Sequence, residues 1–174
     1  RISVIFRGSE SKSDWYYDLQ FFKRKLHDNV YVHKGFWNQL HINNNYEKIK
    51  NIVNELLSIE ENKDFEVIVT GHSLGAALST LFGYEYSREI SQKITVVSFA
   101  SPRVGDKEWR KAFDAQGNLE HYRVSNNKDV VTAAPMFWYQ HVGINIHLSE
   151  SKTEIFKNYS YNTWWKYSLF NCFS

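Results

Sequence analysis

Residues 65–86 carry the feature of the sequence that most restricts how the chain can fold. The β-branched apolar run at 65–70 is typical of a fully buried strand, and the small-residue stretch at 76–86 is typical of a helix. Between them lies only Gly71-His72-Ser73-Leu74-Gly75. A strand and a helix come this close only where glycines stand two positions before and after the serine. We therefore predict a tight, strained turn centred on Ser73.

Such a turn exposes the Ser73 hydroxyl above the carboxyl edge of a sheet. The backbone N–H groups that open the following helix point toward the same place. A G-x-S-x-G sequence between a strand and a helix is typical of a nucleophilic serine. An ordinary glycine-rich turn between strand and helix is the alternative interpretation.

The rest of the chain alternates between strand and helix patterns, which favours an α/β architecture with a mostly parallel sheet. The further elements that we expect are strands at 2–6, 94–99 and 119–124 and helices at 42–57 and 106–115. Asp106 is a candidate N-cap of the last helix. Because no repeat or linker divides the sequence, residues 1–174 are predicted to form a single domain.

The helix expected at 42–57 has seven apolar residues at a spacing of three or four. We predict that they form one buried face, which consists of Ile42, Tyr46, Ile49, Ile52, Val53, Leu56 and Leu57.

Composition excludes several classes of protein. Lys and Arg number 21 against 19 Asp and Glu, a net charge of +2, which is too small to indicate a nucleic-acid partner. No apolar run approaches the ~18–20 residues of a transmembrane segment. The single cysteine, Cys172, excludes an internal disulfide. The chain opens at Arg1, directly before a strand pattern, so we expect the interior of a longer protein, trimmed at one or both ends.

Five segments match, in order, the pattern of one known family. They are Phe6-Arg7-Gly8-Ser9 with Asp14-Trp15 and Asp18-Leu19, then Val32-His33-Lys34-Gly35-Phe36, the turn at 71–75, Phe99 to Asp106, and Tyr122 through Asp129 to Gly143. With them the chain resembles the class 3 (fungal lipase-type) triacylglycerol lipases over about residues 2–148.

The resemblance implies a three-layer α/β-hydrolase fold and a Ser-His-Asp triad. It implies that Ser73 is the nucleophile that forms an acyl-enzyme and that Asp129 is the acid that orients the histidine. The implied oxyanion hole uses the backbone N–H groups of Ser9 and Leu74. The implied substrates are lipid carboxylic esters, above all acylglycerols, met at a lipid–water interface. No metal and no organic cofactor is implied.

The catalytic histidine does not follow from the pattern. Five of the seven histidines precede Asp129, which breaks the Ser…Asp…His order of the fold. We expect the base to lie beyond Ser174. Recruitment of His141 or His147 is one alternative, and a triad that has lost its histidine is another.

Two rival functions stay open. One is a non-lipid esterase, such as a feruloyl-type esterase, and the other is a catalytically silent lipase-like binding module. The aromatic stretch at 15–22 forms either a flap over an acyl groove or packing on the sheet edge. Lys23, Arg24 and Lys25 follow it and would lie near anionic headgroups in the first case. We expect a soluble domain and leave its compartment open, with secretion and peripheral association with lipid surfaces as alternatives.

Overall fold

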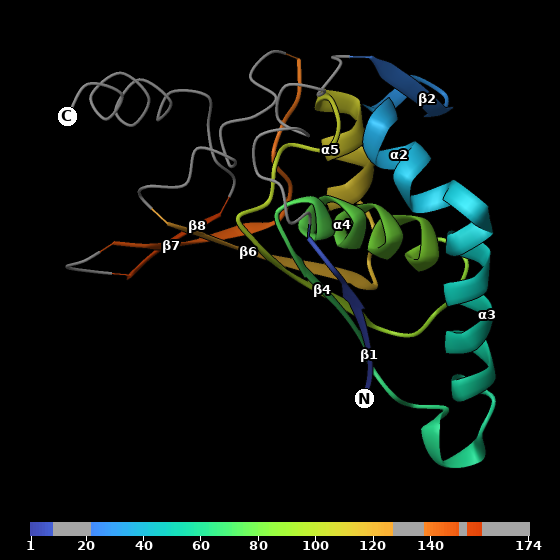
Figure 1. Ribbon diagram of the computed structural model, residues 1–174. Coiled ribbons are helices and arrows are strands. Elements are labelled where there is room, and N and C mark those ends of the chain that lie inside the picture. The colour runs from blue at the N-terminus through green and yellow to red at the C-terminus, as the bar shows by residue number, and fades with distance from the viewer. Residues whose placement is uncertain (9–21, 127–137, 150–152, 158–174) are drawn as a thin grey trace.

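The computed structural model describes residues 1–8, 22–126, 138–149 and 153–157 (Figure 1). Several positions singled out in the sequence lie outside these residues. Ser9 and Asp129 are among them, as are residues 15–21 of the aromatic stretch.

A six-stranded sheet forms the centre of the molecule, in the order β1-β4-β5-β6-β7-β8. Its strands are β1 Ile2–Phe6, β4 Val67–His72, β5 Ile94–Phe99, β6 Leu119–Asn126, β7 Ile144–Leu148 and β8 Thr153–Lys157. Neighbouring strands from β1 to β7 run parallel, and β8 is antiparallel to β7. The prediction of an α/β fold with a mostly parallel sheet is confirmed.

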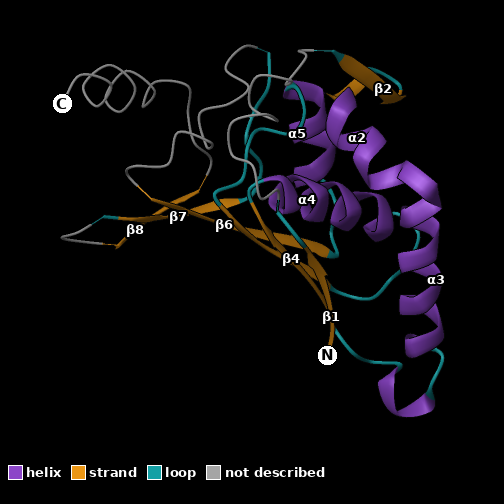
Figure 2. Cartoon of the chain, in the orientation of Figure 1, coloured by secondary structure: helices purple, strands orange, loops and turns teal. Residues whose placement is uncertain are grey.

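Four α-helices accompany the sheet in the described part of the chain: α2 Lys34–His41, α3 Asn45–Leu57, α4 Leu74–Ser87 and α5 Lys107–Asp114. A small antiparallel hairpin, β2 Lys23–His27 with β3 Val30–His33, lies beside α2 and α5 (Figure 1). Helix α4 packs directly on β1, β4 and β5 and is buried along almost its whole length. Figure 2 shows these helices gathered on one side of the sheet.

The two faces of the sheet therefore differ strongly in solvent exposure. On the face beneath α4, Val67, Val69 and Val96 are fully buried. On the opposite face Ile5 is 75% exposed and Ile155 is 69% exposed. Within the described residues, the sheet and one helical layer are in place.

The prediction for 42–57 needs correction. A 3-10 turn, Ile42–Asn44, precedes α3, because Asn43 and Asn44 have positive φ angles of 52° and 61°, a conformation that asparagine tolerates better than most residues. Only part of the predicted apolar face is buried, since Ile52 is 57% exposed and Leu56 is 38% exposed. Ile42 is 48% exposed as well.

Other boundaries agree with the sequence or refine it. Asp106 caps α5, and its carboxylate accepts a hydrogen bond of 3.0 Å from the Trp109 backbone N–H. The helix expected at 76–86 begins earlier, at Leu74. Helix α2 and the β2–β3 hairpin were not predicted.

Candidate active site

Ser73 joins β4 to α4 in a backbone conformation that few residues adopt. Its φ is 56° and its ψ is −119°, outside the allowed regions for a residue with a side chain. The Ser73 N–H donates to the Phe99 carbonyl at 3.0 Å, and its own carbonyl accepts from the Ala76 N–H at 3.0 Å. These bonds tie the turn to β5 and to the helix, so the predicted strained turn is confirmed.

Two glycines make this close approach possible. A Cβ at Gly71 would lie 2.3 Å from the backbone carbonyl of Gly75, and a Cβ at Gly75 would lie 2.3 Å from the Phe6 carbonyl oxygen. Separations below 3.0 Å essentially never occur for real Cβ atoms. The glycines thus let β4, α4 and the end of β1 converge on Ser73.

Leu74 is the first residue of α4. The first N–H groups of a helix ordinarily lack a partner within it, and the helix dipole adds partial positive charge there. In α4 the Ala76 and Ala77 N–H groups donate to the Ser73 carbonyl. Gly8 lies on the other side of the turn, where a Cβ would be 2.7 Å from the His72 carbonyl oxygen. The chain after β1 therefore passes directly beside the Ser73 turn. Ser9 is the next residue and lies outside the described residues.

The other predicted member of the triad is Asp129. Strand β6 ends at Asn126 at the same carboxyl edge of the sheet, and Asp129 follows it outside the described residues. The structure brings together Ser73 and Leu74, and the roles assigned to Asp129 and Ser9 stay predictions.

The two fallback histidines occupy different places. His147 lies on β7, where its Nδ1 is 3.2 Å from the Ser125 Oγ. Since β7 is three strands from β4, strand spacing alone separates it from Ser73 by roughly 14 Å, too far for a hydrogen bond. His141 follows Gln140, whose N–H donates to the Gly105 carbonyl at 2.7 Å. It lies near Pro102, His121 and Arg123, around a gap with no room for a water molecule.

A row of polar side chains lies beneath the helices and was not predicted from the sequence. On β6 the buried positions include His121, Arg123 and Ser125. The His121 Nε2 lies 2.7 Å from the Ser98 Oγ of β5. Burial, helped by the positive charge of Arg123, lowers the pKa of His121 to about 3. The signal was present in the sequence, because these polar residues alternate along a strand whose other positions face away.

The described residues contain no cluster of His, Cys, Asp and Glu that could hold a metal ion. In the same part of the chain, no helix combines the length and the apolar character needed to cross a membrane.

The family model for class 3 lipases matches residues 3–138, which contain the Ser73 turn and, apart from Ile2, the strands β1, β4, β5 and β6. The chain belongs to the class 3 lipase family. A lipase from Rhizopus microsporus var. chinensis has the same α/β-hydrolase fold, with a TM-score of 0.76 and 28% identity. The similarity covers 88% of this chain and 54% of that lipase.

Curated relatives are similarly distant in sequence. Phospholipase A1-II 3 of Oryza sativa subsp. japonica is 32% identical over 139 residues, which cover 74% of this chain and 33% of the relative. Secreted mono- and diacylglycerol lipase A of Penicillium cyclopium is 32% identical over 147 residues, which cover 81% of this chain and 46% of the relative. The chain thus spans about a third to a half of the length of these relatives.

Proposed function

We propose that the whole protein hydrolyses carboxylic esters of glycerolipids and that Ser73 is its nucleophile. The observation that carries the proposal is the strained backbone of Ser73 at the end of β4, held by Gly71 and Gly75 in a class 3 lipase fold. This arrangement presents a serine hydroxyl beside the N–H groups of a helix start.

The reaction follows from these positions. The Ser73 Oγ attacks the ester carbonyl carbon and loses its proton to a histidine, and the Leu74 and Ser9 N–H groups stabilise the resulting oxyanion. The alcohol leaves with that proton, and water then releases the acid from the acyl-enzyme. Asp129 holds the imidazole in the required tautomer. We place the histidine outside residues 1–174 and keep His141 as the alternative, because His147 is too far from Ser73.

A cluster of exposed aromatic and basic residues supports action at a lipid–water interface. Phe22 is 61% exposed and Trp138 is 75% exposed. The Tyr139 hydroxyl donates to the Phe22 carbonyl at 3.3 Å, which holds the two segments side by side. Lys23 and Lys107 lie with Trp138 along a groove of about 320 Å³, which Asp106 and Glu108 also line, and the Lys23 Nζ lies 3.7 Å from the Asp106 Oδ2. Exposed aromatic rings beside lysines are suited to the headgroup region of a membrane.

The test is an assay of the full-length protein on emulsified triacylglycerol, diacylglycerol, phosphatidylcholine vesicles and methyl ferulate. We expect hydrolysis of glycerolipid esters and its abolition by Ser73→Ala, with an unchanged circular dichroism spectrum. Asp129→Asn should lower kcat by ~10⁴. Activity confined to methyl ferulate would favour the feruloyl-type esterase. Equal activity in the wild type and Ser73→Ala would refute the mechanism, and a folded protein without any activity would favour the silent binding module.

A further inference from the structure

A groove that contains no residue of the Ser73 turn brings together charged and aromatic side chains from three separate segments. Its volume is about 320 Å³, and it is lined by Lys23 of β2, residues 106–108 at the start of α5 and residues 138–140. We call it the Trp138 groove. Ligand pockets span ~300–1,000 Å³, so this volume suits a small polar group better than a whole lipid.

Backbone hydrogen bonds hold the walls of the Trp138 groove in place. The Gln140 N–H donates to the Gly105 carbonyl at 2.7 Å. The Asp106 N–H donates to the Tyr31 carbonyl at 3.0 Å. Tyr139 is 3% exposed, so the segment that carries it is anchored in the molecule. The groove is therefore formed by the fold itself.

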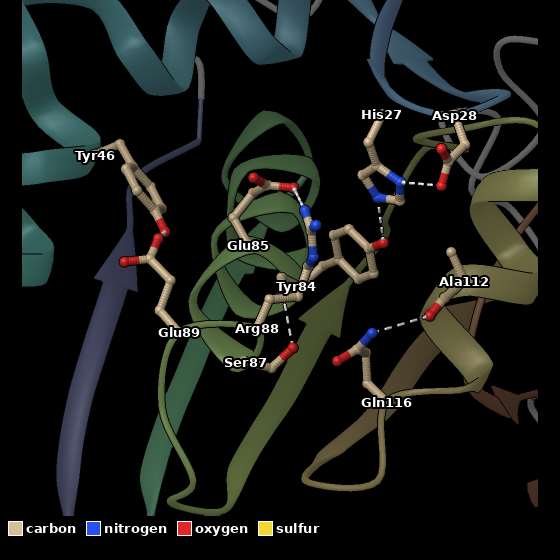
Figure 3. Close-up of polar contacts among 10 residues, drawn as sticks. All are labelled: His27, Asp28, Tyr46, Tyr84, Glu85, Ser87, Arg88, Glu89, Ala112 and Gln116. Carbon is tan, nitrogen blue, oxygen red and sulfur yellow. Dashed lines mark hydrogen bonds and ion pairs between the residues drawn. The ribbon is translucent and has the colours of Figure 1, made fainter.

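The strand that carries Lys23 is fixed at both ends. At the far end of β2, the His27 Nε2 lies 2.9 Å from the Tyr84 hydroxyl of α4 (Figure 3). At the near end, the Lys23 Nζ lies 3.7 Å from the Asp106 Oδ2 and 5.8 Å from the centre of the Tyr139 ring. These contacts hold the Lys23 ammonium against the groove.

Most charges along the Trp138 groove already have a partner. Lys23 is paired with Asp106, and the Lys111 Nζ donates to the two carboxylate oxygens of Glu108 at 2.9 and 3.1 Å. Lys107 is exposed and has no ion-pair partner among the residues that the structure describes. The groove therefore offers one ammonium group to an anion, beside two carboxylates that disfavour a second negative charge.

Trp138 combines an unusual backbone with high exposure. Its φ is 67°, in the left-handed region that bulky residues rarely adopt, and it is 75% exposed. Such outliers are concentrated at functional sites. The face of an exposed indole attracts quaternary ammonium groups. A protein segment that covered Trp138 would also bury the Lys107 ammonium, which is costly unless the segment brings a negative charge.

We propose that the Trp138 groove binds the zwitterionic headgroup of a choline phospholipid in a membrane. The phosphate lies at the Lys107 ammonium, and the quaternary ammonium lies on the Trp138 indole, near the carboxylates of Asp106 and Glu108. A headgroup with negative charge alone would meet those carboxylates without compensation, so the groove selects against it. The inference rests on the proposed function, because a protein that hydrolyses glycerolipid esters meets such headgroups at the surface of its substrate.

Binding is tested with the full-length protein and vesicles of diether phosphatidylcholine, which contain no ester to hydrolyse. Cosedimentation should show tighter binding to these vesicles than to diether phosphatidylglycerol vesicles. Trp138→Ala and Lys107→Glu should each raise the dissociation constant about tenfold or more, and Trp138→Phe, which keeps an aromatic ring, less than about threefold. Lys48→Glu on α3 makes the same charge change at another exposed lysine and should leave binding unchanged.

Soluble competitors separate the headgroup from the lipid surface. Phosphocholine at ~10 mM should release more protein from the vesicles than inorganic phosphate at the same concentration. Equal release by both overturns the proposal. So does tighter binding to phosphatidylglycerol, absence of binding to phosphatidylcholine, or a dissociation constant that Trp138→Ala leaves unchanged.

Hydrolysis of soluble p-nitrophenyl butyrate by the same variants monitors the catalytic centre separately. We expect Trp138→Ala and Lys107→Glu to keep this activity while they lose vesicle binding. A protein that binds phosphatidylcholine vesicles through Trp138 but hydrolyses no ester would contradict the proposed function and support the headgroup site. A protein that hydrolyses esters but shows none of the binding differences would do the reverse.

Discussion

Ser73 is held in a backbone conformation that costs on the order of 1–3 kcal/mol, and contacts with neighbouring residues stabilise it. The φ of 56° and ψ of −119° persist because the Ser73 N–H and carbonyl are both hydrogen-bonded and because glycines stand on either side. Strain of this kind is concentrated at functional sites. The turn therefore depends on the absence of a Cβ at Gly71 and at Gly75 as much as on Ser73 itself.

The prediction at the scale of residues concerns Gly75. Gly75→Ala would place a methyl group 2.3 Å from the Phe6 carbonyl oxygen, so α4 and the end of β1 would have to separate. We expect the free energy of unfolding to fall by ~1–3 kcal/mol and ester hydrolysis to fall with it. Gly117→Ala is the matched control, because a Cβ there meets nothing within 4 Å, and stability should change by less than ~0.5 kcal/mol. Equal effects of both substitutions on stability in urea unfolding would contradict this account of the turn.

At the scale of elements, β6 combines a strand pattern with buried polar groups. His121 lies beneath the helical layer, 4% exposed, with its Nε2 next to the Ser98 hydroxyl. Burial and the Arg123 charge lower its pKa from 6.5 to about 3. The folded protein thus keeps this imidazole neutral at pH values where the unfolded chain protonates it.

The pH dependence of stability follows from this difference. Below about pH 6.5 the unfolded chain binds a proton at His121 that the folded chain does not bind until about pH 3. The contribution of His121 is therefore complete above pH 6.5 and is lost as the pH falls, by up to ~1.4 kcal/mol per pH unit. Urea unfolding near pH 7 and near pH 5 should show a smaller decrease for His121→Gln than for the wild type. An identical decrease in both would show that His121 does not carry the effect.

Some strands and helices could be predicted from sequence patterns alone, and others could not. The strands β1, β4 and β5 were predictable because each is a short run rich in β-branched residues. The β2–β3 hairpin was not, since Lys23, Arg24 and Lys25 on its first strand have no apolar alternation. On α3 the apolar spacing was correct, but the spacing alone does not say that α4 covers only the side of Val53 and Leu57.

The candidate site likewise has a part that the sequence predicts and a part that it does not. Ser73 and the glycines around it are adjacent in the sequence, so their geometry follows from local constraints. The base is not local, because a histidine reaches the serine only through tertiary folding. His147 illustrates the difference, since it follows Asp129 in the expected order and still lies three strands from β4.

At the scale of the whole molecule, the described residues form a sheet with one covered face. Val69 is fully buried on the face beneath α4, whereas Ile5, on the neighbouring strand, is 75% exposed on the other. The contribution of an apolar residue to stability should therefore depend on the face to which it points.

Two substitutions to threonine test this asymmetry in the 174-residue chain. Val69→Thr keeps the shape of the side chain but buries a hydroxyl, and we expect a loss of ~1–3 kcal/mol in the free energy of unfolding. Ile5→Thr should change it by less than ~0.5 kcal/mol, because the side chain is already in contact with water. Valine, isoleucine and threonine all favour strands, so the two substitutions change strand propensity to a similar extent. A larger loss from Ile5→Thr than from Val69→Thr in urea unfolding would contradict this description of the sheet.

The nucleophilic character of Ser73 is the central claim, and labelling of the full-length protein with a lipid-like fluorophosphonate tests it most directly. Attack on phosphorus requires an activated serine, and mass spectrometry locates the adduct. We predict a single adduct on Ser73 that is absent from Ser73→Ala. An adduct on another serine, or no adduct on a folded protein, would contradict the claim.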